Sequence, residues 1–195
     1  KLRTLMSFSY EKIMQYPEAY ADKAVTCLAK AHGVSKKSLI IGNGSTEIFN
    51  WIIQTFRPSN AGWIAPCYTG YEEVCRSQKI PYRAIGISSC KTDFKVSKSL
   101  FLDADVGMLF VTNPNNPTGS VIEPEIIISA AKKNSNRIII ADESFIDFLP
   151  DVSLITLIGR DIPANLVVVK SLTKFFAIPG LRLGMAYGQT ETIRK

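Results

Sequence analysis

The sequence predicts an α/β fold in which a mostly parallel central sheet is flanked by helices. Short runs that are apolar throughout recur along the chain, as at residues 166–169, which is typical of strands buried on both faces. These runs alternate with segments whose apolar residues have helical spacing, a pattern that favours parallel strands joined by helices. With 195 residues, of which 46% are hydrophobic and 21% charged, the chain is long enough for a substantial core.

The first part of the chain predicts a helix, a strand and a second helix. Residues 20–31 carry apolar side chains at helical spacing, and Gly33 follows as a terminator. Residues 38–41 form a short apolar run that predicts a strand, and residues 42–44 form a glycine-containing turn. Residues 45–56 again have helical spacing, and Pro58 lies just beyond them.

The rest of the chain alternates between predicted strands and helices. Strands are expected at residues 62–65, 82–87, 106–111, 138–141 and 166–169, and helices at 71–78 and 123–133. Ligands bind beyond the carboxyl ends of parallel strands, so the residues that follow each strand are candidates for a site. These residues are Tyr68, the segment 113–119, Asp142, and Ser171 with Lys174. We therefore expect one crevice that contains an aromatic ring, an amide, a carboxylate and an amine.

Bulk composition disfavours several classes of function. The net charge is +6, but the lysines and arginines are scattered, which disfavours nucleic-acid binding and suits a phosphorylated small molecule. The chain has no long uninterrupted apolar stretch and no signal-peptide pattern, so we expect no membrane insertion.

The cysteines indicate neither a metal site nor a disulfide framework. Cys27, Cys67, Cys75 and Cys90 have no CxxC spacing, and His32 is the single histidine, so a zinc site is not expected. A chain of this size needs no disulfide, which favours a reducing cytoplasm.

Lys174 is the candidate for covalent chemistry. It lies in the segment 171–174 shortly after the apolar run 166–169, with Ser171 three residues before it and Arg182 eight residues after it. A lysine amine at the mouth of a buried strand suits attack on a carbonyl to form a Schiff base. The turn Gly42–Gly44 after an apolar run imitates a dinucleotide-binding fingerprint, but Glu47 stands where the third glycine belongs, so that interpretation is rejected.

Three motifs together resemble the fold-type I pyridoxal 5′-phosphate enzymes of the aminotransferase class. They are Asn113-Pro-Asn-Asn-Pro-Thr-Gly119, Asp142-Glu-Ser-Phe145, and Ser171-Leu-Thr-Lys174 with Arg182. The resemblance covers nearly the whole chain. It implies that Lys174 binds the cofactor covalently and carries a proton at the substrate. It also implies that Asp142 pairs with the pyridinium nitrogen, which makes the ring a strong electron sink.

The resemblance assigns the other cofactor contacts as well. Asn116 would donate its amide to the phenolic oxygen, and Tyr68 would stack on the ring, with Tyr71 as a second candidate for stacking. The cofactor phosphate would be bound by a set of backbone and side-chain groups from Gly44, Ser45, Thr46, Ser171 and Arg182. Tyr16 would reach the cofactor phosphate of a partner subunit, because the family's active sites lie at a homodimer interface.

The resemblance also implies a domain organisation. Residues 1–35 would form an N-terminal arm and helical segment that contacts the partner, and residues 36–195 the large cofactor-binding domain. A smaller C-terminal domain, which binds the substrate carboxylate in the family, is expected to be missing from this chain.

Phe145 separates this chain from many members of the family. They have a tyrosine three residues after the aspartate, and its hydroxyl contacts the phenolic oxygen. Here Asn116 would make that contact alone. Phe145 and the flanking segments resemble the threonine-phosphate decarboxylases of cobalamin biosynthesis, which act on L-threonine O-3-phosphate and in related enzymes on L-serine O-phosphate. One alternative is a histidinol-phosphate aminotransferase that uses 2-oxoglutarate. Another is a truncated, non-catalytic binding subunit.

Overall fold

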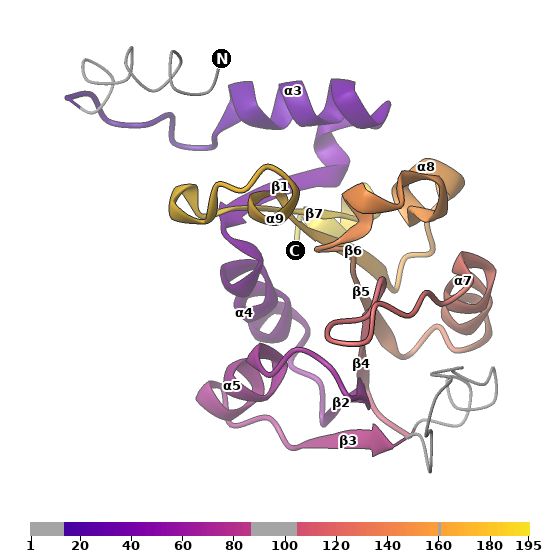
Figure 1. Cartoon of the computed structure of the whole chain (residues 1–195). Helices are drawn as coiled ribbons and strands as arrows, with labels where there is room; N and C mark the ends of the chain where they lie inside the picture. Colours follow the sequence, from indigo (N-terminus) through magenta and orange to yellow (C-terminus); the bar gives the residue numbers. More distant parts are fainter. Residues whose placement is uncertain (1–13, 87–104, 160) are drawn as a thin grey trace.

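We describe the protein from a computed structural model, which covers residues 14–86, 105–159 and 161–195 (Figure 1). The expected strand end at Ile87, the cysteine at Cys90 and the first part of the predicted N-terminal arm lie outside these residues. Within the described part of the chain, no helix is long and apolar enough to cross a membrane.

The centre of the molecule is a seven-stranded sheet with the strand order β1-β7-β6-β5-β4-β2-β3. The strands are β1 (Leu39–Asn43), β2 (Ala61–Ala65), β3 (Tyr82–Gly86), β4 (Met108–Thr112), β5 (Ile138–Asp142), β6 (Leu166–Ser171) and β7 (Leu183–Tyr187). Neighbouring strands from β3 to β6 pair in parallel, whereas β7 is antiparallel to both β6 and β1. The predicted mostly parallel sheet is therefore confirmed.

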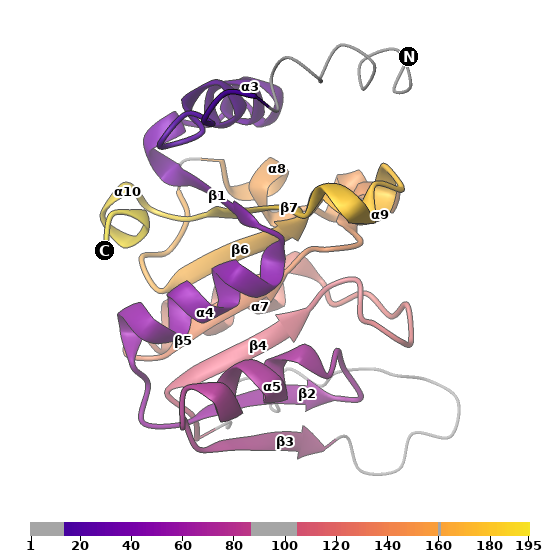
Figure 2. The ribbon, with the colours of Figure 1, turned by 90° about the vertical axis from the view of Figure 1, so that its left-hand side faces the viewer.

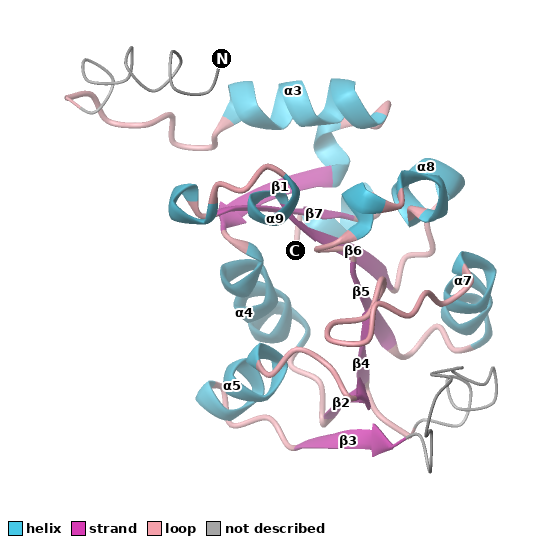
Figure 3. Cartoon of the chain, viewed as in Figure 1, coloured by secondary structure: helices cyan, strands magenta, loops and turns pink. Residues whose placement is uncertain are grey.

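Helices cover both faces of this sheet (Figures 1 and 3). The described helices are α3 (Asp22–His32), α4 (Ser45–Phe56), α5 (Gly70–Ser77), α7 (Pro124–Lys133), α8 (Leu154–Ile158), α9 (Leu172–Phe175) and α10 (Thr190–Ile193). Short 3-10 turns are η1 (Lys36–Ser38), η2 (Ile146–Phe148), η3 (Pro150–Val152) and η4 (Pro179–Leu181). Figure 2 shows α4 and α5 in front of the sheet, and α7 lies behind it.

Alternating side chains of the central strands divide the core into two layers. Met108 and Phe110 of β4 pack in the cluster that contains residues of α4 and α5. Leu109 and Val111 point the other way, into the cluster that contains residues of α7 and α8. Because β4 is buried on both faces, it has a continuous apolar sequence instead of an alternating one.

The sequence did not predict β7, although residues 183–187 complete the sheet between β1 and β6. This segment contains Gly184 and follows the helix breakers Pro179 and Gly180, so its pattern is weak as a strand signal. The predicted strand at 82–87 forms β3 at the edge of the sheet. Tyr82, Arg83 and Ala84 of β3 are exposed, so this strand is not buried on both faces.

Gly184 allows β7 to approach the start of α4 very closely. A Cβ atom at residue 184 would lie 2.5 Å from the backbone nitrogen of Ser45 and 2.6 Å from the carbonyl carbon of Gly44. Both contacts are to backbone, which cannot rotate away as a flexible side chain can. The turn between β1 and α4 can therefore pack directly against β7 only because residue 184 has no side chain.

A buried ionic cluster lies on the α8 side of β5 and β6. The Lys170 amine lies 2.7 Å from Oδ1 of Asp147 and is almost fully buried. Glu143 accepts hydrogen bonds from the Ser153 hydroxyl at 2.8 Å and from the Leu154 backbone N–H at 2.6 Å. Burial nevertheless raises the pKa of Glu143 to about 7.

Gly184→Ala should destabilise the fold because the new Cβ overlaps the backbone of residues 44 and 45. We expect a loss of about 1–3 kcal/mol in the free energy of unfolding, measured by urea denaturation. Gly180→Ala is the matched control, since nothing lies within 4 Å of a Cβ there. Equal stability of Gly184→Ala and the wild type would contradict the close packing.

Glu143→Gln should change how stability depends on pH. The folded-state pKa of about 7 lies above the ordinary value of 4.5, so folding favours the protonated form of Glu143. Its contribution to stability is fully present below pH 4.5 and is lost as the pH rises through 7. Between pH 5 and 8 the wild type should lose on the order of 2 kcal/mol more than Glu143→Gln. Parallel pH profiles from urea denaturation would refute this assignment.

Candidate active site

A pocket of about 190 Å³ lies beyond the carboxyl ends of β4, β5 and β6. Thr112 and Asp142 are the last residues of β4 and β5, and Ser171 is the last residue of β6. The full lining consists of Ser45, Thr46, Tyr68, Thr112, Asn116, Asp142, Ser144, Phe145, Ser171, Lys174 and Arg182. The crevice expected from the strand ends is thus formed, and it contains each of the four expected kinds of group.

Asp142 lies buried in this pocket and accepts three hydrogen bonds. Its Oδ2 accepts from the Tyr71 hydroxyl at 2.5 Å. Its Oδ1 accepts from the backbone N–H and the hydroxyl of Ser144, at 3.0 and 2.5 Å. Burial raises the pKa of the Asp142 carboxyl, and the hydrogen bonds from Ser144 and Tyr71 and the charge of Lys174 oppose that rise.

Tyr71, which was the second candidate for stacking on the cofactor ring, does not line the pocket with its ring. Its ring is fully buried, stacked on Phe110 with centroids 4.6 Å apart and edge-on to Phe49 at 5.4 Å. Its hydroxyl contacts Thr112 at 2.8 Å as well as Asp142. Burial and the neighbouring Asp142 raise the pKa of Tyr71 well above 10. The ring is therefore unavailable for stacking on a ligand, and the hydroxyl acts as a hydrogen-bond donor.

One end of the pocket is suited to an anion. The helix α4 begins at Ser45, and its N-cap residue Gly44 makes no side-chain cap, so backbone N–H groups of the first turn point outwards. The guanidinium of Arg182 lies beside Gly44, where a Cβ would approach its Nη2 to 2.6 Å. Positive backbone dipoles and a guanidinium are groups that suit a phosphate.

The loop that carries Asn116 is fixed by the side chain of Asn113. That amide donates to the Ile122 carbonyl at 3.0 Å and accepts from the Ile122 N–H at 2.8 Å. The amide of Asn115 also donates to the Pro66 carbonyl at 3.0 Å. The loop is thereby tied to the segment that leads to Tyr68.

The remaining predicted residues are more exposed. Lys174 lies in α9 and is exposed at the pocket, and Tyr68 is exposed at its rim, edge-on to Tyr71. Tyr16 is fully exposed and does not line the pocket. Of the ten predicted site residues, eight line the pocket, Gly44 lies at the turn beside Arg182, and Tyr16 lies apart.

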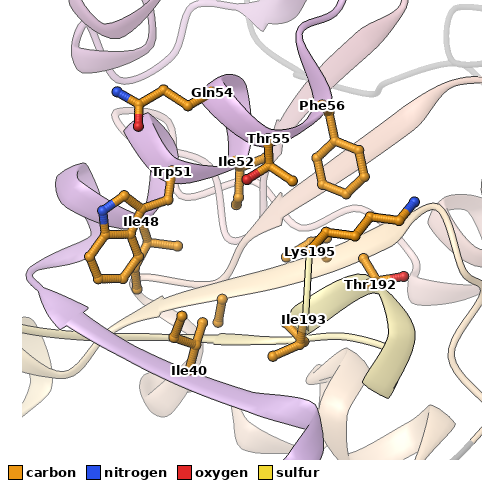
Figure 4. Close-up of a pocket in the computed structure, with 12 residues that line it drawn as sticks. Ile40, Ile48, Trp51, Ile52, Gln54, Thr55, Phe56, Thr192, Ile193 and Lys195 are labelled. Carbon is orange, nitrogen blue, oxygen red and sulfur yellow. The ribbon is translucent and has the colours of Figure 1, made fainter. Parts of the chain in front are cut away.

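A second cavity of about 250 Å³ lies between α4 and α10. Figure 4 shows Ile193 and Lys195 on one side of it and Trp51 and Phe56 on the other. The Lys195 amine lies 5.4 Å from the centroid of the Phe56 ring. Its lining is largely aliphatic and aromatic and contains no carboxylate side chain, in contrast to the first pocket. In the described ranges, no three histidine, cysteine, aspartate or glutamate side chains form a candidate metal site.

The polar groups of the first pocket fit a particular kind of ligand. The start of α4 and Arg182 suit a phosphate, the buried carboxylate of Asp142 suits a basic ring nitrogen, and the Lys174 amine suits a carbonyl carbon. These three features are those of pyridoxal 5′-phosphate, so the residues present fit the expected cofactor.

The sequence did not identify three of the polar residues in and beneath the pocket. Ser144 and Thr112 were not expected to take part, and Tyr71 was assigned another role. A signal existed for Ser144, since a hydroxyl two residues after an aspartate often bonds to its carboxylate. No local signal marks Thr112 or the Tyr71 hydroxyl, because the contacts of Tyr71 with Thr112 and with Asp142 join segments that are distant in sequence.

The family profile described as "Aminotransferase class I and II" matches residues 7–195. A curated relative is a histidinol-phosphate aminotransferase of Lactococcus lactis subsp. cremoris, 31% identical over 193 residues, which cover 98% of this chain and 52% of that protein. Another is the adenosylcobalamin biosynthesis bifunctional protein CobDQ of Leptospira interrogans, 27% identical over 95% of this chain and 22% of that protein. The chain thus spans about half the length of the first relative and about a fifth of the length of the second.

Solved structures agree with this fold. The L-threonine-O-3-phosphate decarboxylase of Porphyromonas gingivalis matches 99% of this chain and 57% of its own, with a TM-score of 0.83 and 25% identity. The histidinol-phosphate aminotransferase of Sinorhizobium meliloti, solved in complex with pyridoxal 5′-phosphate, matches 96% of this chain and 52% of its own, with a TM-score of 0.83 and 17% identity.

Proposed function

Because this chain belongs to the class I and II aminotransferase family of pyridoxal-phosphate-dependent, fold-type I enzymes, we propose that it decarboxylates a phosphorylated amino acid. The proposed substrate is L-threonine O-3-phosphate or L-serine O-phosphate, and the product is the amino-alcohol phosphate used in cobamide biosynthesis. The observation that carries the proposal is the pocket itself, which joins a phosphate-binding end, a buried carboxylate and an amine.

The proposal gives each residue of the pocket a task. Asp142 pairs with the ring nitrogen of the cofactor, Asn116 donates to its phenolic oxygen, and Tyr68 stacks on its face. The phosphate is held by the backbone of residues 44–46, the Ser171 hydroxyl and the Arg182 guanidinium. Lys174 would hold the cofactor through its amine, which would become free to move a proton once the substrate amine is bound.

Bound pyridoxal 5′-phosphate supplies an electron sink that stabilises the negative charge developing at the substrate Cα. Asp142 maintains that capacity by keeping the ring nitrogen protonated. Lys174 then delivers a proton from its Nζ to the substrate Cα after carbon dioxide has left. In transamination the same amine would instead remove the Cα proton, so Lys174 and Asp142 serve either reaction.

Two observations support decarboxylation. The solved threonine-phosphate decarboxylase has the same fold over nearly the whole chain at 25% identity, and the CobDQ relative acts in adenosylcobalamin biosynthesis by its name. Phe145 adds a third, because it lines the pocket without a hydroxyl, as the resemblance to the decarboxylase group implies. Asn116 then makes the contact to the phenolic oxygen without a tyrosine.

A histidinol-phosphate aminotransferase is the second candidate, because a curated relative with that name is 31% identical to this chain. Both candidate substrates carry a primary amine that could take the place of Lys174, so the roles proposed for Lys174 and Asp142 suit either reaction. The two reactions differ in whether a 2-oxo acid acceptor is required.

We also propose that residues 1–35 form an arm for a homodimer and that residues 36–195 form the cofactor-binding domain. Tyr16 is fully exposed and lies outside its own pocket, which is compatible with a contact to the phosphate in a partner subunit.

Lys174→Ala should abolish the visible absorbance that the wild type acquires with pyridoxal 5′-phosphate and retains after desalting. The reason is that the amine forms the covalent bond to the cofactor. Lys132→Ala, which removes an exposed lysine at the end of α7, is the matched control and should keep the absorbance. Absence of absorbance in the wild type, or its persistence in Lys174→Ala, would sink the cofactor assignment.

Carbon dioxide should be released from L-threonine O-3-phosphate by the cofactor-loaded full-length protein without any 2-oxo acid. The measurement is product analysis by mass spectrometry together with trapping of carbon dioxide, repeated with L-serine O-phosphate. Glutamate production from histidinol phosphate and 2-oxoglutarate, with no carbon dioxide from either phosphoamino acid, would show transamination instead.

A further inference from the structure

The Asp142 carboxylate stands in a chain of hydroxyl groups that reaches across the floor of the pocket. Thr112 contacts Tyr71, Tyr71 contacts Oδ2 of Asp142, and Ser144 contacts Oδ1. Apart from Tyr71, which is completely enclosed, each of these residues has only a few per cent of its surface exposed. Water therefore contributes little to solvating this carboxylate, and the hydroxyl groups take its place.

The directions of these hydrogen bonds follow from counting protons. An ionised carboxylate can only accept, so Tyr71 and Ser144 each give their single hydroxyl proton to Asp142. The Tyr71 oxygen then has no proton left for Thr112, and Thr112 must donate to Tyr71. The hydroxyl protons of Thr112, Tyr71 and Ser144 consequently all point along the hydrogen bonds that lead to Asp142.

We propose that Tyr71 and Ser144 are positioning residues that hold the Asp142 carboxylate ionised and in one orientation before any ligand binds. Hydrogen bonds to the charged form of an acid favour that form, and those to charged groups are the stronger kind. They oppose the burial that would otherwise protonate Asp142. The ring contacts of Tyr71 with Phe110 and Phe49 fix the position of its hydroxyl.

The same count indicates where a ligand N–H can bind. A carboxylate offers about four acceptor positions, two on each oxygen. Ser144 fills both positions on Oδ1 with its N–H and its hydroxyl, whereas Tyr71 fills one on Oδ2. The remaining acceptor position lies on Oδ2, so this oxygen would receive a ring nitrogen, a consequence that rests on the proposed function.

Other titratable groups face Asp142 and enter any measurement of its protonation. The Lys174 charge favours the ionised form of Asp142. The Cys67 thiol faces it from the segment after β2, and burial and Asp142 raise the pKa of that thiol to about 12. Tyr71 likewise stays protonated because its pKa is raised well above 10. Neither the Cys67 thiol nor the Tyr71 hydroxyl therefore changes charge in the pH range where a carboxyl titrates.

The test is a titration of the Asp142 carboxyl in the cofactor-free full-length protein by carbon-13 NMR. The resonance is assigned by its absence in Asp142→Asn. Loss of one hydroxyl, in Ser144→Ala or Tyr71→Phe, should raise the titration midpoint by about one pH unit or more. The double variant should raise it further. An unchanged midpoint in both single variants would overturn the proposal.

Two further variants separate a specific hydrogen bond from general disturbance of the core. Ser144→Thr keeps a hydroxyl and should restore the midpoint towards that of the wild type. Ser153→Ala removes a buried hydroxyl that donates to the adjacent carboxylate, Glu143, at 2.8 Å, and should leave the Asp142 midpoint unchanged. A shift in Ser153→Ala equal to that in Ser144→Ala, or no recovery in Ser144→Thr, would argue against the proposal.

Titration of each variant with pyridoxal 5′-phosphate separates this inference from the proposed function. The wild type should bind pyridoxal 5′-phosphate, and the absorbance of the bound cofactor should stay constant across neutral pH. Ser144→Ala should bind the cofactor more weakly, and the absorbance of its bound cofactor should change as the pH is lowered. Normal cofactor binding with an unshifted carboxyl would refute the positioning role alone. Shifted midpoints in a protein that binds no cofactor would refute the proposed function alone.

Discussion

The parallel register of β4, β5 and β6 is the constraint on which the pocket depends. Thr112 pairs with Asp142 across β4 and β5, and Asp142 pairs with Val169 across β5 and β6. All three strands therefore end at one edge, and the side chains at and beyond their last residues meet there. A slip of one residue in β5 would turn Asp142 to the other face of the sheet, where α8 lies. The carboxylate of the pocket is consequently fixed by the hydrogen bonds of the sheet backbone.

The alternation of strand side chains gives two consecutive acids opposite environments. Asp142 faces the pocket and is surrounded by hydroxyl donors and Lys174. Glu143 points to the α8 side, where Ser153 and the Leu154 N–H bond to it. Burial raises the pKa of both carboxyl groups. Asp142 lines the pocket, whereas Glu143 joins the start of α8 to the end of β5.

Much of the fold and the pocket could be predicted from the sequence, because apolar runs and strand ends are local signals. These signals predict the central strands, Asp142, Lys174 and the segment 113–119, whereas the family resemblance singles out Asn116 within that segment. Three features could not. β7 carries a glycine that weakens its strand pattern, the ring of Tyr71 is buried by partners from other segments, and Thr112 meets Tyr71 across 41 positions of sequence. These depend on tertiary packing, which no short window of sequence contains.

The position of β7 between β1 and β6 has a consequence for the order in which the molecule assembles. The anion-binding end joins the Gly44–Ser45 turn to Arg182 and Gly184, groups separated by well over a hundred residues. Such distant pairings form slowly, since a long loop must close first. During synthesis the early turn lacks the neighbouring Arg182 guanidinium and Gly184 backbone until β7 enters the sheet. Under the proposed function, affinity for the cofactor phosphate would arise only after β7 has joined the sheet, and a phosphorylated ligand would selectively stabilise chains that have completed this step.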